Sequence, residues 1–204
     1  MLIWLVLIPL IAAALIGLCK APARPTALLS ASLTLALGIW ALVSFDGCSS
    51  CWSRFEGMDL QLTLAPALSK VMLLLTILVT FATVLGTNPP QGGEASWYNS
   101  ALLISAGATG AFLSDNIISF FAFHELALIP TFVMIGLYGR GDRRTTAWRA
   151  TLYLGLASMV LLAALLMIGT QAGFTFSGLK DFMASGRELA HAELIGALLI
   201  AGFG

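Results

Sequence analysis

The stretch IISFFAFHELALIPTFVMIGLYG, residues 117–139, determines the fold class of this chain. A helix crosses the hydrocarbon core of a bilayer, which is about 30 Å thick, with roughly 20 mostly apolar residues, and this run meets that requirement. Its apolar residues do not alternate with polar ones, which excludes a strand of a membrane barrel. The stretch therefore predicts a transmembrane helix, with His124 and Glu125 near its middle.

The composition of the whole chain agrees with a membrane location. Of the 204 residues, 59% are hydrophobic and 10% are charged, and the mean hydropathy is +0.95. Soluble domains carry about 25% charged residues, so this chain in water would expose large apolar patches. A soluble enzyme, a nucleic-acid-binding protein and a disordered tail are excluded. Ten basic and ten acidic residues cancel, so the net charge indicates no partner beyond the lipid bilayer.

Other runs of similar length predict further spanning helices. They cover residues 1–19, 26–45, 67–87, 96–114 and 150–170. The run at 194–204 is too short to cross at 1.5 Å per residue, so we expect the sequence to be the N-terminal part of a longer subunit. The predicted fold is all-α: a polytopic transmembrane bundle with six complete spanning helices plus a truncated seventh, forming a single membrane domain over residues 1–204. The longer loops, 46–66 and 171–193, have room for short structured pieces.

Lysine and arginine positions predict the orientation, since cytoplasmic loops carry an excess of both. One side of the membrane receives Lys20, Arg24, Arg140, Arg143, Arg144 and Arg149. The other side receives Arg54, Lys70, Lys180 and Arg187. The richer side should be cytoplasmic, which predicts a multi-pass protein of the cell (inner) membrane with an extracytoplasmic N-terminus.

The three cysteines allow only limited inferences. Cys48 and Cys51 form a C-x-x-C in a loop expected to face outward, where oxidation is permitted. They are either a small disulfide or redox pair, or two ordinary loop cysteines. A single such pair lacks the second pair of ligands of a zinc site. Cys19 is interpreted as a small apolar residue at a helix end.

Glu125 is the most informative residue of the chain. A charged side chain at the bilayer centre costs about 2.5–3.5 kcal/mol on insertion scales, so it has to face protein, water or a basic partner. A carboxyl in such surroundings can take up and release a proton, which makes Glu125 the leading candidate for a functional site. The alternative is a structural carboxyl satisfied by a Ser, Thr or Lys of a neighbouring helix.

Other polar residues near this span are weaker candidates. His124 lies about 100° from Glu125 around the helix; it could join a proton path, since imidazole changes charge near neutral pH, or serve as a neutral donor. Pro130 removes a helical hydrogen bond and either admits water or bends the helix. Arg149 either reaches the interface or serves a proton path. Asp115 is expected to cap the helix that begins at Ile117.

The stretch Phe121–Gly139, in which Glu125 is followed by Leu128-Ile129-Pro130, resembles a known family. It is similar to the proton-pumping NADH:quinone oxidoreductases (respiratory complex I), and among their chains to the antiporter-like subunit M, or chain 4. The fifth helix of that subunit typically has an aromatic run, a glutamate and a hydrophobic-hydrophobic-Pro step. His124 stands where the subunit usually has tryptophan.

The next helix supports the same resemblance. Arg149, Tyr153 and Ala157-Ser158 fall where the family has a lysine or arginine, a tyrosine and a small-Ser pair. Residues 198–204 resemble the opening of its seventh helix. The resemblance implies that Glu125 pairs with a lysine of that helix, which would lie beyond Gly204, and that Arg149 replaces the family's lysine in the sixth helix.

The resemblance implies a membrane subunit that takes part in proton translocation, coupled to electron transfer in partner subunits. The chain would belong to a translocase without having a redox centre or cofactor of its own. NADH, FMN, iron–sulfur clusters and quinone would bind in partner subunits, and neighbouring antiporter-like subunits would pack beside it. The alternatives are a subunit of a cation/proton antiporter or membrane-bound hydrogenase of the same superfamily, and an inactive truncated structural product.

Overall fold

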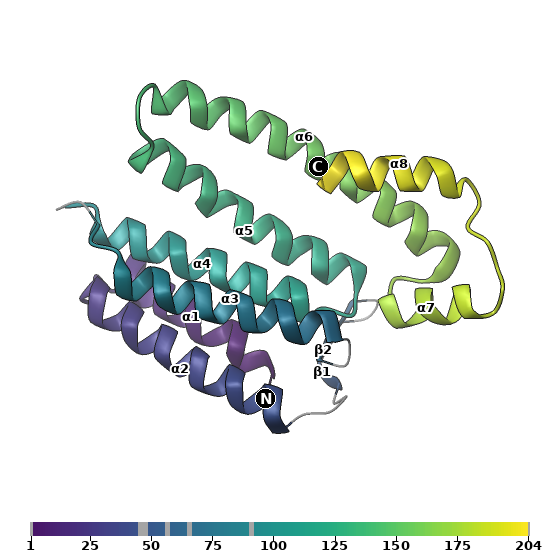
Figure 1. Cartoon of the computed structure of the whole chain (residues 1–204), viewed down its shortest axis with the longest axis horizontal. Coiled ribbons are helices and arrows are strands. Elements are labelled where there is room, and N and C mark those ends of the chain that lie inside the picture. Colours follow the sequence, from purple (N-terminus) through teal and green to yellow (C-terminus); the bar gives the residue numbers. More distant parts are fainter. Residues whose placement is uncertain (1, 45–48, 56–57, 65–66, 90–91, 204) are drawn as a thin grey trace.

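The computed structural model describes residues 2–44, 49–55, 58–64, 67–89 and 92–203. Its elements form an elongated array of helices with one small β-hairpin (Figure 1). In chain order they are α1 (Leu2–Leu18), α2 (Ala23–Ser44), β1 (Ser49–Phe55), β2 (Met58–Thr63), α3 (Ala67–Gly86), α4 (Glu94–Leu113), α5 (Ile117–Tyr138), α6 (Arg143–Ala172), α7 (Phe176–Ala184) and α8 (Ala192–Phe203). The helical fold is confirmed, and the hairpin is an addition to the predicted all-α architecture.

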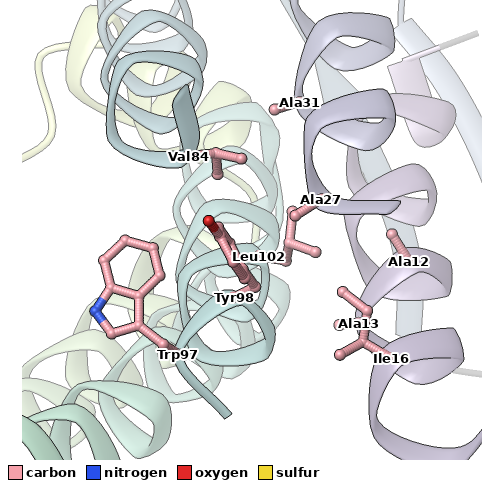
Figure 2. Close-up of a cluster of buried hydrophobic side chains, with 9 residues drawn as sticks. All are labelled: Ala12, Ala13, Ile16, Ala27, Ala31, Val84, Trp97, Tyr98 and Leu102. Carbon is pink, nitrogen blue, oxygen red and sulfur yellow. The ribbon is translucent and has the colours of Figure 1, made fainter. Parts of the chain in front are cut away.

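Helix α4 is the centre of the first part of the fold, where it packs against α1, α2, α3 and α5. Small residues of α1 and α2 let these helices approach the large side chains of α4 (Figure 2). Tyr98 is fully buried among them, and its hydroxyl donates a hydrogen bond to the Thr87 carbonyl at 3.4 Å. This cluster comprises Ala12, Ala13, Ile16, Ala27, Ala31, Val84, Trp97, Tyr98 and Leu102.

Glycines bring α4 very close to α5. A Cβ at Gly107 would lie 2.8 Å from the backbone oxygen of Phe123 and from the backbone nitrogen of Ala127. One at Gly110 would overlap the Phe123 ring. The backbone on either side of Glu125 is therefore fixed against α4.

Helices α6 and α8 form the far part of the array. Gly202 of α8 packs on Leu161 of α6, where an added Cβ would lie 2.8 Å from the Leu161 backbone nitrogen. A cluster of buried apolar residues joins α5, α6 and α8 at their common end: Ile117, Leu161, Leu165, Ile168 and Ile195. Phe176 and Leu179 of α7 pack against this cluster.

The predicted helix boundaries are close to the observed ones, with one large exception. Helix α6 begins at Arg143 and not at residue 150, because Asp142 caps it by accepting a hydrogen bond from the Thr145 backbone nitrogen at 3.3 Å. The first turn of α6 is polar, so its mean hydropathy is low, and hydropathy alone does not reveal where this helix begins. Pro130 does not interrupt α5, which continues through it with Pro130 buried.

The two long loops contain ordered pieces, as expected. In the first, β1 and β2 pair antiparallel from Ser49 opposite Thr63 to Phe55 opposite Met58. In the second lies α7. Cys48 falls outside the described residues, so pairing with Cys51 stays a prediction, while Cys19 is an exposed free thiol.

Four helices, α2, α3, α5 and α6, are long and apolar enough to cross a membrane. Helix α1 has 17 residues, and α4 falls outside this set, so the predicted count of six complete spans plus a truncated seventh is not confirmed. The loop after α1 and the loop after α5 lie at one end of the array, and the strands β1 and β2 and helix α7 lie at the other (Figure 1). Both loops used to predict the orientation are therefore at the same end.

Candidate functional site

Glu125 lies on α5 and faces the groove between α5 and α6. Its side chain is 33% exposed, but Oε1 is buried and has no hydrogen-bond partner in the described part of the chain. The groove is a cavity of about 160 Å³. Its other walls are mostly apolar: Leu128, Ile129, Phe132, Ile135, Ala150, Thr151, Leu154 and Gly155. The Thr151 hydroxyl is already used, since it donates to the Ala147 carbonyl at 2.8 Å.

His124 contacts Glu125 despite its different direction on the helix. Its Nδ1 is 3.8 Å from Glu125 Oε1, and this nitrogen is also buried without a hydrogen-bond partner among the described residues. The distance is too long for a hydrogen bond. The structure thus brings two predicted site residues, His124 and Glu125, into contact.

Three phenylalanines surround the imidazole of His124. Phe120 and Phe121 stack on it, with ring centroids 6.3 and 6.5 Å away. Phe203 of α8 meets it edge-on at 6.4 Å. Neither Phe120 nor Phe203 was predicted from the sequence as part of the site. Phe120 could have been found from its spacing, since residues four apart on a helix are neighbours, whereas nothing local places Phe203 there.

Arg149 does not join this pair. It is exposed on α6, beside the groove residue Ala150, and no ion pair links it to Glu125 within the described ranges. Tyr153 is 74% exposed, while Ser158 is buried and donates to the Gly155 carbonyl at 3.0 Å. Lys70 lies on α3 and is not among the residues that line the groove.

The role expected for Asp115 is wrong by one residue. Asn116 is the N-cap of α5, and its side chain accepts from the backbone nitrogens of Ile118 and Ser119 at 2.8 and 3.3 Å. Asp115 instead binds α7, where it accepts from the Ser177 hydroxyl at 2.7 Å and the Ser177 backbone nitrogen at 3.1 Å. The partner of Asp115, Ser177, lies far away in the sequence, so local sequence rules could not predict this contact.

Within the described residues there is no group of three or more His, Cys, Asp or Glu side chains that could hold a metal ion. At the polar start of α6, the pKa of Asp142 is lowered below its ordinary value by hydrogen bonds from the side chain and the backbone of Thr145. That carboxyl caps α6 and does not line the Glu125 groove. The site is therefore a carboxyl–imidazole pair beside an apolar groove.

Comparisons with known proteins show which proteins these helices resemble. The family model described as "NADH:quinone oxidoreductase/Mrp antiporter, TM" matches residues 114–204, which include both members of the pair and Arg149. F(420)H(2) dehydrogenase subunit M of Methanosarcina mazei is 25% identical over 168 residues, 78% of this chain and 34% of that protein. NAD(P)H-quinone oxidoreductase chain 4 2 of Microcystis aeruginosa is 28% identical over 134 residues, 63% of this chain and 24% of that protein.

A solved structure agrees over the whole chain. A chain of respiratory complex I from Thermus thermophilus with bound NADH superposes with a TM-score of 0.80 at 24% identity, covering 100% of this chain and 42% of that one. The protein is an integral membrane protein, and its fold is that of this chain of the Thermus complex. The resemblance to antiporter-like subunit M (chain 4) is confirmed. The chain spans about a third or less of the length of the two relatives from Methanosarcina and Microcystis.

Proposed function

We propose that this chain takes part in proton translocation as a membrane subunit of a respiratory NADH:quinone oxidoreductase. The observation that carries the proposal is the Glu125 carboxyl, which lies within a membrane-length helix with Oε1 buried, no hydrogen-bond partner among the described residues, and His124 Nδ1 at 3.8 Å. A carboxyl held in apolar surroundings is costly to keep as a charge. A role in proton transport would explain why a carboxyl occupies this unfavourable position.

In this proposal Glu125 is the proton carrier and His124 is its immediate exchange partner. The groove between α5 and α6 is narrow and apolar, so few water molecules compete for the proton. Arg149 lies one residue from the groove wall, outside the pair. It would supply a fixed positive charge at the end of the groove near the α5–α6 loop.

The redox chemistry would belong to other subunits. NADH, FMN, iron–sulfur clusters and quinone would bind there, and neighbouring antiporter-like subunits would pack beside this chain in the inner membrane. The basic end of the array, with Lys20, Arg140 and Arg143, would face the cytoplasm, which places the N-terminus outside. The remaining predicted crossings, α1 and α4, would span with the four longer apolar helices.

The test is proton pumping by the assembled complex that carries Glu125→Ala. We expect pumping to fall at least about tenfold, because a positioned proton-transfer group contributes about 10²–10⁴-fold, while the complex still assembles. Glu193→Ala is the matched control, since that glutamate is exposed in the first turn of α8. Full pumping by a well-assembled Glu125→Ala complex would sink the proposal.

A second candidate is a cation/proton antiporter subunit, and the family description that includes Mrp antiporters favours it as the alternative. The same buried carboxyl would serve either ion exchange. Transport and NADH oxidation measured on the purified native complex distinguish the two candidate functions. Sodium-dependent transport without NADH oxidation would support the antiporter, and NADH-driven proton uptake without a sodium requirement would support the oxidoreductase.

A further inference from the structure

Helix α7 is fastened to the start of α5 by hydrogen bonds from both backbone and side chains. The backbone nitrogen of Phe176 donates to the Asp115 carbonyl at 2.7 Å, and that of Ile117 donates to the Phe174 carbonyl at 2.9 Å. The Asp115 carboxylate accepts both bonds from Ser177 described above. Because these bonds form one compact group, α7 cannot move away from α5 without breaking several of them.

A continuous series of ring contacts leads from this junction to the carboxyl–imidazole pair. Phe176, the first residue of α7, meets Phe120 edge-on with ring centroids 5.7 Å apart. Phe120 stacks on His124, and His124 Nδ1 lies 3.8 Å from Glu125 Oε1. Each step is a direct contact between neighbouring side chains.

Phe120 holds a special place in this series because it touches three other rings. Besides Phe176 and His124, it contacts Phe203 of α8 at 6.3 Å. Phe121 also stacks on His124, but the ring contacts of the described residues do not link it to α7. Among the ring contacts of the described residues, Phe120 therefore differs from Phe121 in two, one with Phe176 of α7 and one with Phe203 of α8.

The geometry points to Asp115 and Phe120 as positioning residues for the Glu125–His124 pair. Asp115 fixes the position of α7 against α5, and Phe120, which contacts both α7 and His124, couples that position to the imidazole. The position of α7 against α5 then determines whether Glu125 Oε1 stays shielded from water. The assignment of proton transport to Glu125 rests on the proposed function, but the positioning claim concerns only the water access of this carboxyl.

Infrared spectroscopy of the complex in native-lipid nanodiscs tests the claim. With ¹³C-labelled glutamate, the band that disappears in Glu125→Gln identifies the protonated Glu125 carboxyl. Its rate of hydrogen–deuterium exchange reports water access. We expect Asp115→Ala and Phe120→Leu each to accelerate exchange about two- to thirtyfold, the range typical of coupling between sites, and to lower the carbonyl stretching frequency as water bonds to the carboxyl.

Matched variants separate positioning from general loosening. Asp115→Asn keeps an acceptor for Ser177 and should rescue slow exchange. Ser185→Ala removes a hydroxyl bonded to the Phe182 carbonyl at the other end of α7 and should have no effect. If Asp115→Ala disrupts assembly, Ser177→Ala removes the hydroxyl bond to Asp115 from the α7 side and leaves the bond from the Ser177 backbone nitrogen.

Unchanged exchange in assembled Phe120→Leu together with Asp115→Ala or Ser177→Ala would overturn the proposal, as would equal acceleration by Ser185→Ala. These results do not depend on pumping. If Glu125→Ala pumps normally, the proposed function fails, and the exchange rates still decide whether α7 positions the pair.

Discussion

Helices α4 and α5 are neighbours of similar length, 20 and 22 residues, but they are buried to very different degrees. Eleven residues of α4 are buried, whereas in α5 only Ile117 and Pro130 are. The buried polar groups of α4 are uncharged, as in Ser105, which accepts a hydrogen bond from Thr80 at 3.0 Å. The ionisable pair lies on α5, the less buried helix.

The two helices therefore have different roles: α4 is the structural support, and α5 carries the candidate site. Helix α4 is enclosed by four other helices and fixes the α5 backbone through Gly107. Helix α5 keeps much of its surface open to lipid, water or further protein, and it carries Glu125 on the face toward α6. A carboxyl that changes protonation needs both features: a backbone that does not move and a path to the proton.

The largest contrast should come from two leucines, one on each helix. Leu102 of α4 is fully buried, while Leu137 of α5 is 49% exposed. We expect Leu102→Ala to lower the free energy of unfolding by about 2–5 kcal/mol because it leaves a cavity, and Leu137→Ala to change it by about 0.5 kcal/mol or less. Thermal unfolding in detergent measures both, and equal effects would show that burial does not distinguish the two helices.

A smaller contrast should come from two glycines. An added Cβ at Gly107 of α4 meets the α5 backbone, while at Gly136 of α5 its nearest neighbour is the Ala147 Cβ at 3.7 Å, an ordinary contact. Gly107→Ala should destabilise the protein by about 1–3 kcal/mol through overpacking. Gly136→Ala should stabilise it slightly, since alanine favours a helix. The same unfolding measurements apply; a harmless Gly107→Ala would show that α4 does not fix α5.

The smallest effect concerns the first turns of α4 and α6. Gly93 caps α4 without a side-chain hydrogen bond, whereas Asp142 caps α6 and has a pKa lowered from 3.8 by the Thr145 hydrogen bonds. A lowered pKa means that capping contributes fully above pH 3.8 and is lost as the pH falls through the lowered value. The NMR signal of the Thr145 amide should shift in that range, and Asp142→Ala should abolish the shift. A signal that titrates equally in Asp142→Ala would contradict this origin.

Much of the fold could be predicted from the sequence because membrane helices are set by apolar length. The ends of α3 and α5 agree within one residue with the runs at 67–87 and 117–139. Glu125 and His124 stand out because ionisable groups are rare in such runs. Their contact with each other was left open, because angular spacing on a helix does not fix how long side chains bend.

The predictions that differ from the structure failed for two physical reasons. Some residues bind partners on distant segments of the chain, and the polar end of a helix is not detected by hydropathy. Asp115 fits the rule for a helix cap, but Ser177 of α7 binds it, and Asn116 takes the cap. The start of α6 is polar, so apolar length alone placed it late. The part of Arg149 in a proton path stays a prediction, and its side chain is exposed beside the groove.

Whether the Glu125 carboxyl carries protons is decided by the number of protons moved per NADH oxidised in the assembled Glu125→Gln complex. Glutamine keeps the size of the side chain and removes only its ability to titrate. We expect a markedly lower ratio for Glu125→Gln and a partly retained ratio for Glu125→Asp, which keeps a carboxyl. An unchanged ratio in Glu125→Gln would show that protons cross without this residue.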